Sequence, residues 1–160
     1  YTPMHYNGKE DVDTSQYETK FDAFADTYNK NDFSVSDTVL NILEKEADFI
    51  ILAGFLWRIP QKIVTAFPKK IINIHPALLP KYGGKGMYGM HVHKAVKENN
   101  EKETGITIHY VNANYDEGAI IYQAKTALNN HDTPETIAKK IHLLEHRYFP
   151  KVIEEVILSI

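Results

Sequence analysis

Two kinds of apolar spacing alternate along the chain, and together they predict its helices and strands. Continuous apolar runs are typical of strands buried on both faces, whereas apolar residues three or four apart mark one face of a helix. Helices are therefore expected at 17–28, from Ser36 to Ala47, from Pro60 to Phe67, from His91 to Asn99, and from Thr133 to the end with an interruption near Pro150. Strands are expected at 49–53, which Gly54 ends, at 71–74, which His75 and Pro76 stop, at 106–111 and at 119–124.

The order of these elements predicts the fold class. Helix and strand alternate until the last two strands, which is typical of an α/β domain with a mostly parallel sheet and helices on both faces. A chain of 160 residues buries roughly 70% of the surface that its unfolded form exposes, enough for one sizeable core. We expect a single domain over 1–160, in which residues 1–33 are an atypical or incomplete N-terminal part because they are polar and poorly periodic.

Composition and charge narrow the possible functions. The 18 Lys and Arg against 21 Asp and Glu give a formal net charge of −3, whereas a nucleic-acid binder usually carries a basic domain or stripe. No apolar run approaches the roughly 20 residues that a membrane span needs. The chain has no Cys, which excludes disulfides, thiolate catalysis and Cys-based zinc sites and permits a reducing compartment. We expect a cytoplasmic protein with no nucleic-acid or membrane partner.

A glycine-rich segment from Gly84 to Gly89 matches the G-x-G-x-x-G spacing of dinucleotide-binding loops. Such a loop has to join a strand directly to a helix, so that the phosphate meets the helix N-terminus. Here the nearest predicted strand ends at Ile74, and Pro76 and Pro80 lie between. This context favours a flexible active-site or packing loop over a phosphate-binding cradle.

Two histidine pairs have a spacing that metal ligands can use, His91 with His93 and His142 with His146. Neither pair belongs to an H-E-x-x-H motif, and histidines at such positions are more often helix-surface or capping residues. We therefore expect no metal site.

Asn73 and His75 alternate at the end of a predicted buried strand, so that their side chains can project to the same side. Ligands of open α/β sheets bind at that end of the strands. There an Asn amide can donate to an oxyanion, and a neutral His can act as a general acid or base. The same two side chains could instead only hold the following loop in place. The residue types alone leave both the catalytic and the structural interpretation open.

Asp116 lies two residues before Gly118 in a loop that follows a strand. An acid near a glycine is usually part of a turn. If the fold brings Asp116 to His75, the carboxylate would orient the imidazole and raise its pKa. A serine nucleophile is not expected, because the chain has no G-x-S-x-G motif.

Three segments carry a resemblance to a known family: Leu52 to Phe55, Asn73 to Tyr82 and Tyr115 to Gly118. Together they closely resemble the folate-dependent phosphoribosylglycinamide formyltransferases of purine synthesis. The second segment is specific for the formyltransferase superfamily. Its combination with a glycine-rich loop and His-x-His is most similar to the purine enzymes. The resemblance covers about residues 36–150 and implies a Rossmann-like fold.

The activity that the resemblance implies is formyl transfer from 10-formyltetrahydrofolate, as co-substrate, to the amine of glycinamide ribonucleotide. In that reaction Asn73 would hydrogen-bond the formyl oxygen as it becomes an oxyanion. His75 would donate a proton or stabilise the oxyanion. Asp116 would raise the pKa of His75 and help to move protons through a water. Acyl transfer to an amine needs such oxyanion donors and a proton shuttle, and no covalent nucleophile.

The same resemblance implies which residues bind the two substrates. Folate would contact Leu56, Trp57, Arg58 and Ile59, largely through backbone groups, together with Val111, Asn112 and Lys30, and the ribonucleotide would contact Glu145 and Pro76. Trp57 stands where many family members carry a basic residue. The partners expected are these small molecules, with the protein itself a monomer or a homodimer.

The front of the chain departs from the family pattern. The family begins with a strand and a glycine-rich loop that binds the substrate phosphate at a helix N-terminus, and residues 1–33 contain no such pattern. Three alternatives therefore stay open: another folate-dependent formyltransferase acting on a sugar or a tRNA, a formyl-folate hydrolase, or a non-catalytic truncated folate-binding module.

Overall fold

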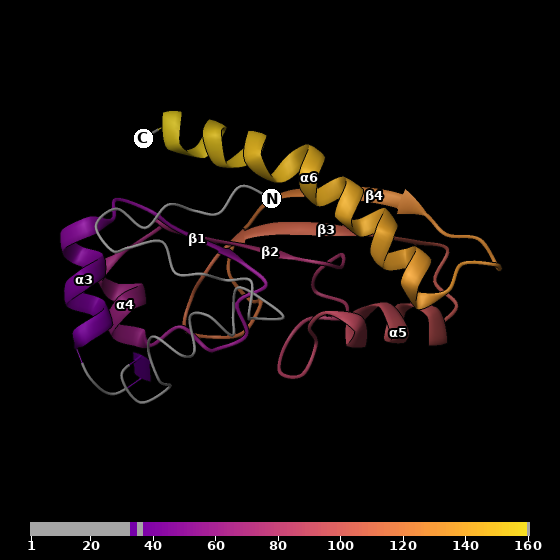
Figure 1. Cartoon of the computed structure of the whole chain (residues 1–160), viewed down its shortest axis with the longest axis horizontal. Coiled ribbons are helices and arrows are strands. Elements are labelled where there is room, and N and C mark those ends of the chain that lie inside the picture. The colour runs from indigo at the N-terminus through magenta and orange to yellow at the C-terminus, as the bar shows by residue number, and fades with distance from the viewer. Residues whose placement is uncertain (1–32, 35–36, 160) are drawn as a thin grey trace, which may run out of the picture.

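The predicted elements can be compared with a computed structural model of the chain, which describes residues 33–34 and 37–159 (Figure 1). Its helices are α3 (Thr38–Glu46), α4 (Gln61–Ala66), α5 (Met90–Glu98) and α6 (Pro134–Leu158), and its strands are β1 (Ile50–Ala53), β2 (Ile71–His75), β3 (Glu103–Tyr110) and β4 (Ile120–Ala127). The helix expected at 17–28 and the capping Ser36 lie outside the described residues. The other predicted helices and strands are confirmed, with ends that shift by a few residues.

The sheet is mixed, which corrects the expectation of a mostly parallel sheet. Its strand order is β1-β2-β3-β4, and β1 pairs with β2 in parallel, whereas the β2–β3 and β3–β4 pairs are antiparallel. The segment 111–119 between β3 and β4 is shorter than the dozen or so residues that a parallel crossover needs. Hydrophobic periodicity reports burial and carries no information about strand direction, which is why it did not predict that β3 runs against β2.

Strand β2 separates two parts of the core, because successive side chains of a strand point to opposite faces. Ile72 and Ile74 pack with buried residues of α5 and α6, while Ile71 on the other face packs with buried residues around α3 and α4. Helices thus cover both faces of the sheet, as expected (Figure 1). Strand β1 is only half-buried, contrary to expectation, since it lies at the edge of the described sheet.

Helix α6 runs through Pro150 without the expected interruption. It begins with a capping box, in which the Thr133 side chain accepts from the backbone N–H of Thr136 and the Thr136 side chain accepts from the backbone N–H of Thr133. Proline removes one helical hydrogen bond, but Ile141 and Val152 on either side of it are buried in the same core, which holds the helix together. Within the described residues, no helix is long and apolar enough to cross a bilayer.

His93 lies on the buried face of α5 with Val92 and Val96. It is 4% exposed, and its Nδ1 has no hydrogen-bond partner in the described part of the chain. Burial, followed by the neighbouring charges of His142 and His75, lowers the pKa of His93 to about 4. A neutral imidazole with an unpaired nitrogen is therefore part of the core.

We expect His93 to make the fold sensitive to acid. Because its pKa is lower in the folded protein than in the unfolded chain, its full contribution to stability is present above about pH 6.5 and is lost as the pH falls toward 4. The loss amounts to about 3 kcal/mol in the free energy of unfolding between pH 7 and pH 4. Urea unfolding at the two pH values measures it, and His93→Leu should lose correspondingly less stability on acidification than the wild type.

The control for removing a histidine is His131→Leu, because His131 is exposed in the loop before α6. If acidification destabilised His93→Leu as much as the wild type, the burial of a neutral His93 would be the wrong explanation.

Candidate active site

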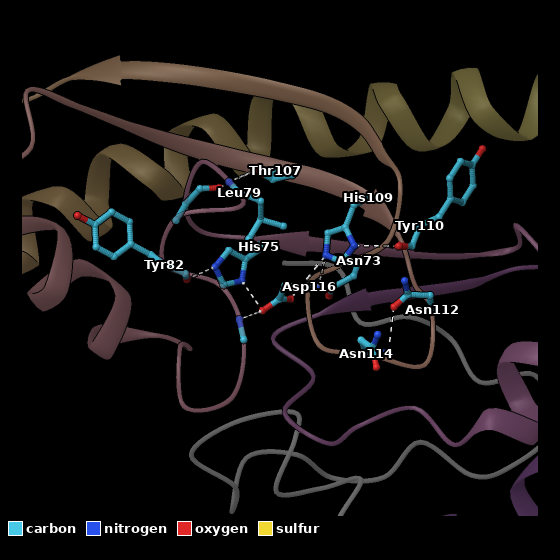
Figure 2. A network of polar contacts seen from close by, with 12 residues as sticks. Asn73, His75, Leu79, Tyr82, Thr107, His109, Tyr110, Asn112, Asn114 and Asp116 are labelled. Carbon is cyan, nitrogen blue, oxygen red and sulfur yellow. Dashed lines mark hydrogen bonds and ion pairs between the residues drawn. The ribbon is translucent and has the colours of Figure 1, made fainter.

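The candidate active site lies on one face of β2 and β3, at the carboxyl end of β2 (Figure 2). The antiparallel register places Asn73 opposite His109 and His75 opposite Thr107. Directly opposite residues share a face of the sheet, as do residues two apart on one strand. Four polar side chains consequently lie on one face, at the end of the strand where open α/β sheets bind ligands.

Both ring nitrogens of His75 have partners. Its Nε2 lies 2.7 Å from the carbonyl oxygen of Tyr82, and its Nδ1 lies 3.5 Å from Oδ2 of Asp116. A carbonyl oxygen only accepts, so the hydrogen-bond pattern assigns the proton to Nε2, and in the neutral ring Nδ1 presents its lone pair to the carboxylate. The side chain is 4% exposed, so both contacts are shielded from water. The approach of Asp116 to His75, which the sequence left conditional, is confirmed.

Asp116 reaches two histidines from the loop between β3 and β4 (Figure 2). Its Oδ1 lies 3.7 Å from Nε2 of His109, and its Oδ2 accepts a 2.9 Å hydrogen bond from the backbone N–H of Gly84. Its φ of 55° is in the left-handed region, which Asp tolerates better than most residues. The loop thus forms a turn and also delivers a carboxylate to the site.

Burial and charge act against each other on these two groups. Burial lowers the pKa of His75, and it outweighs the raising effects of the Asp116 charge and the Tyr82 carbonyl. Burial raises the pKa of Asp116, but the neighbouring His109 ring, the charge of His75 and the Gly84 N–H hold that pKa below its usual value. The expected raising effect of Asp116 on the pKa of His75 is present, and burial outweighs it. Near neutral pH, an ionised carboxylate lies beside a neutral imidazole.

His109 is a site residue that the sequence patterns did not single out. Its Nδ1 lies 2.9 Å from the carbonyl oxygen of Tyr110, which assigns the proton to Nδ1. Its Nε2 then accepts from Nδ2 of Asn73 at 3.1 Å, which orients the Asn73 amide and leaves that amide a second N–H for another acceptor. The sequence shows that His109 and Thr107 alternate along a predicted strand and so share one face. It does not show that this strand pairs with β2, which is what brings His109 to Asn73.

The glycine-rich segment belongs to this site as a packing loop, as its sequence context favoured. Gly84 donates to Asp116, and a Cβ on Gly83 would lie 3.2 Å from Cβ of Asp116 and 2.5 Å from Cδ2 of Leu79. Residues 76–89 separate β2 from α5, so the strand–turn–helix context of a dinucleotide-binding loop is missing here. A side chain on Gly83 would therefore crowd Leu79 first and Asp116 second.

The two segments expected to contact folate lie beside each other. Arg58 Nε donates to the carbonyl oxygen of Ala113 at 2.7 Å, which joins the segment 56–59 to the loop that begins at Val111. Leu56 is 40% exposed, whereas Ile59 is buried. Leu56 can therefore offer its side chain to a ligand, but Ile59 can offer only its backbone.

The Trp57 side chain belongs to an aromatic cluster and not to an open surface. Its ring lies 5.7 Å from that of Phe33 and 6.1 Å from that of Phe55, measured between centroids. These distances are typical of packed aromatic pairs. The half-buried Trp57 ring is therefore part of an aromatic cluster with Phe33 and Phe55.

Of the other predicted binding residues, Lys30 lies outside the described residues. Glu145 lies on α6, where its Oε2 is 2.8 Å from Nδ1 of His142. Because α6 packs on the sheet face opposite that of Asn73, the structure does not bring Glu145 into the polar network. Pro76 is half-buried directly after β2, and Asn112 is half-buried in the loop that carries Asp116.

The two histidines of the first pair lie on different sides of α5. His91 is exposed and its ring lies 5.1 Å from that of Tyr88, whereas His93 is buried on the other side of α5. No group of three or more His, Cys, Asp or Glu that could hold a metal ion occurs in residues 33–34 and 37–159.

The amide, the two histidines and the carboxylate at this strand end include the hydrogen-bond donors and proton-transfer groups that acyl transfer to an amine can use. Residues 5–153 match the family model described as Formyl transferase, so the chain belongs to the formyl transferase family.

Relatives and solved structures agree with this membership. The chain is 48% identical over 116 residues to the chloroplastic phosphoribosylglycinamide formyltransferase of Arabidopsis thaliana, covering 72% of this chain and 40% of that protein. It is 41% identical over 112 residues to the phosphoribosylglycinamide formyltransferase of Bacillus subtilis, covering 70% of this chain and 55% of that protein. The crystal structure of phosphoribosylglycinamide formyltransferase from Bacillus halodurans matches with a TM-score of 0.70 at 34% identity, covering 82% of this chain and 66% of that chain.

These comparisons confirm the resemblance seen in the segment from Asn73 to Tyr82, and the Rossmann-like α/β fold class with it. The chain spans about half the length of these two curated relatives, 40% of one and 55% of the other.

Gly118 provides a test of how tightly the loop of Asp116 is held. A Cβ at this position would overlap the carbonyl oxygen of Tyr110, so Gly118→Ala should lower the free energy of unfolding by about 3 kcal/mol. Gly86→Ala is the control, because a Cβ on Gly86 meets open space. Only its positive φ of 88° disfavours alanine, so the free energy of unfolding should fall by about 1 kcal/mol. Urea unfolding measures both values, and equal losses would contradict the close approach at Gly118.

Proposed function

We propose that this protein transfers a formyl group from 10-formyltetrahydrofolate to the amine of glycinamide ribonucleotide, a step of purine synthesis. The observation that supports this most directly is the convergence of Asn73, His75 and Asp116 at one strand end, within a chain of the formyl transferase family. These three residues supply an oxyanion donor, a titratable ring and an ionised base, which is what acyl transfer to an amine requires.

Asn73 would stabilise the oxyanion. One N–H of its amide donates to His109 Nε2, and the rigid pairing on β2 and β3 holds the other in a fixed direction. A donor that is oriented before the reaction needs no reorganisation as charge develops on the formyl oxygen. His109 would act here as a positioning residue, because it holds the amide without touching the substrate.

Asp116 and His75 would move the proton. As the amine nitrogen bonds to the formyl carbon, ionised Asp116 accepts the proton that the amine loses, and Nδ1 of His75, 3.5 Å away, can share it. The proton returns to the folate nitrogen as its bond to the formyl carbon breaks, so none is gained or lost. The lowered pKa of His75 makes its protonated form a stronger acid, which suits this return.

The residues beside the site fit a flat heteroaromatic ligand. Exposed Leu56 and half-buried Val111 offer apolar surface, and the Arg58–Ala113 hydrogen bond brings their two segments together. Backbone groups of 56–59 and the side chain of Asn112 would supply the polar contacts. When bound, 10-formyltetrahydrofolate supplies the formyl group, and no metal takes part in the proposal.

Other parts of the proposal rest on the resemblance alone. They are contacts of Lys30 with folate and of Glu145 and Pro76 with the ribonucleotide, and a monomeric or homodimeric state. One domain over 1–160, a cytoplasmic location and the lack of a nucleic-acid partner are proposed from length, charge and composition. The absence of Cys is compatible with that compartment, while the relative in Arabidopsis thaliana is chloroplastic.

The direct experiment mixes the protein with 10-formyltetrahydrofolate and glycinamide ribonucleotide and follows the formylated product. Asn73→Ala should lower kcat about 10²- to 10³-fold, because it removes an oxyanion donor. His75→Ala should lower kcat about 10²- to 10⁴-fold, because it removes the proton carrier. A rate like that of the wild type in His75→Ala would refute the mechanism.

Two matched controls use the same residue types away from the site. The control substitutions are Asn99→Ala and His131→Ala. Asn99 lies at the end of α5 and His131 in the loop before α6, and both residues are exposed. Neither substitution should change kcat more than about twofold, since surface changes away from special features alter stability little.

The same mixture distinguishes the alternatives. A hydrolase would release formate from 10-formyltetrahydrofolate in the absence of any amine. A transferase for another acceptor would formylate a sugar or an aminoacyl-tRNA in place of the ribonucleotide. A binding module would bind the folate and formylate nothing.

A further inference from the structure

Tyr82 holds a backbone conformation that an aromatic residue rarely adopts. Its φ of 58° lies in the left-handed region, where the Cβ of a bulky residue is crowded by its own backbone. Such a conformation persists only where the surrounding contacts determine it, and it is commonest at functional sites. The contacts that hold Tyr82 also hold its carbonyl oxygen, which lies 2.7 Å from Nε2 of His75.

The side chain of Tyr82 points away from His75 (Figure 2). Its hydroxyl donates to Oε1 of Glu101 at 2.9 Å, and its half-buried ring packs against the core. Burial, followed by the hydrogen bond and the charge of Glu101, raises the pKa of Tyr82 to about 12. The hydroxyl therefore keeps its proton at neutral pH and donates it to Glu101.

Glu101 offers a fixed and charged acceptor from the turn between α5 and β3. The carbonyl oxygen of the neighbouring Lys102 accepts from the backbone N–H of Leu128 at 2.9 Å, which ties this turn to the end of β4. Hydrogen bonds from Lys81 and then from Tyr82 hold the pKa of Glu101 below its usual value, so its carboxylate is ionised. An ionised acceptor makes a stronger hydrogen bond than a neutral one.

Lys81 contacts the same carboxylate oxygen but is the weaker of the two contacts. Its Nζ lies 2.8 Å from Oε1 of Glu101, and the Lys81 side chain is 68% exposed. Ion pairs that are open to solvent contribute little, because water screens them and the long side chain loses freedom. We therefore expect Tyr82, and not Lys81, to fix the loop on Glu101.

The segment that this contact fixes reaches both members of the His75–Asp116 pair. Two residues after Tyr82, the backbone N–H of Gly84 donates to Oδ2 of Asp116 at 2.9 Å. Residues 82–84 thus present a carbonyl oxygen to one member and an N–H to the other. Fixing Tyr82 at its far end limits how far both backbone groups can move.

We propose that Glu101 is a positioning residue, which through the Tyr82 hydroxyl holds residues 82–84 against His75 and Asp116. The effect of Glu101 on formyl transfer rests on the function proposed above, whereas its effect on the hydrogen bond from Gly84 to Asp116 does not. That hydrogen bond involves no atom of His75, so the inference is independent of the protonation of the ring. The sequence pattern did not single out Glu101.

The test follows the amide proton of Gly84 by NMR. Gly83-Gly84 is the only Gly-Gly pair in the chain. Glycine labelled with ¹³C at the carbonyl and with ¹⁵N therefore gives a single HNCO signal, which belongs to Gly84. A hydrogen bond to a carboxylate moves an amide proton downfield and slows its exchange with solvent, and the wild type should show both effects.

Two variants break the contact from its two ends. Tyr82→Phe removes the hydroxyl and keeps the ring, and Glu101→Ala removes the acceptor and keeps the test decisive if Tyr82→Phe does not fold. In each variant the Gly84 amide proton should move upfield and exchange about tenfold faster, as the loss of about one hydrogen bond implies. Glu101→Gln keeps an oxygen acceptor for the hydroxyl and should recover most of the wild-type signal.

Two matched controls should keep the wild-type Gly84 signal. Lys81→Met removes the other partner of Glu101 and leaves the Tyr82 hydroxyl in place. Tyr122→Phe removes a hydroxyl elsewhere, because Tyr122 lies on β4 with its ring 5.4 Å from that of Tyr148 on α6.

Kinetics supply a second and separate result. Where the wild type transfers formyl, Tyr82→Phe and Glu101→Ala should each lower kcat about tenfold with KM changed less than about threefold. A misplaced catalytic group costs rate and not ground-state binding. Glu101→Gln should recover most of kcat, whereas a role in stability alone would affect neither the Gly84 signal nor the split between kcat and KM.

An unchanged Gly84 signal in either Tyr82→Phe or Glu101→Ala, once folded, would overturn the inference whatever the activity. An equal loss in Lys81→Met would overturn it as well, because the ion pair and not the hydroxyl would then hold the loop. If the wild type transferred no formyl while both variants released the Gly84 amide, the positioning by Glu101 would stand and the proposed function would fall. The two failures are thus distinguishable.

Discussion

The antiparallel pairing of β2 with β3 is the constraint on which the site depends. This register brings Asn73 to His109 and His75 to Thr107, and a slip of one residue in either strand would move that strand's two side chains to the opposite face. The alternating isoleucines of both strands prevent the slip, because they are buried on the other face against α5 and α6. Burying each such side chain is worth about 1.5–3 kcal/mol, so the core that stabilises the fold also determines the geometry of the site.

The loops then add the charged and polar contacts of the proposed proton-transfer site. Asp116 enters from the β3–β4 loop, Gly84 and the Tyr82 carbonyl enter from the loop after β2, and each contacts a group already placed by the sheet. Because the site is shielded from water, the Asp116 carboxylate stays ionised through hydrogen bonds while burial keeps His75 neutral. Loops carry the reactive contacts, and the sheet supplies the precision.

Much of this could be predicted from the sequence, and the omissions have a common physical cause. Apolar runs and helical spacing predicted most elements, and the Asn73-x-His75 pattern with Asp116 predicted the centre of the site. The direction of β3, and therefore His109 and Thr107 as neighbours of the site, depends on pairing between distant segments. The lowered pKa of His75 could not be predicted, because burial, which a sequence does not report, outweighs the expected raising effect of Asp116. Trp57 likewise required its aromatic neighbours to be known.

The central claim is that His75 and Asp116 act as one proton-transfer unit, and a double-mutant cycle on formyl transfer tests it most directly. The cycle compares kcat for His75→Asn, Asp116→Asn and the double variant under the same conditions. Residues that act as a unit are strongly non-additive, so the double variant should be no slower than the slower single variant by more than about threefold. Losses that multiply across the two sites would contradict this account.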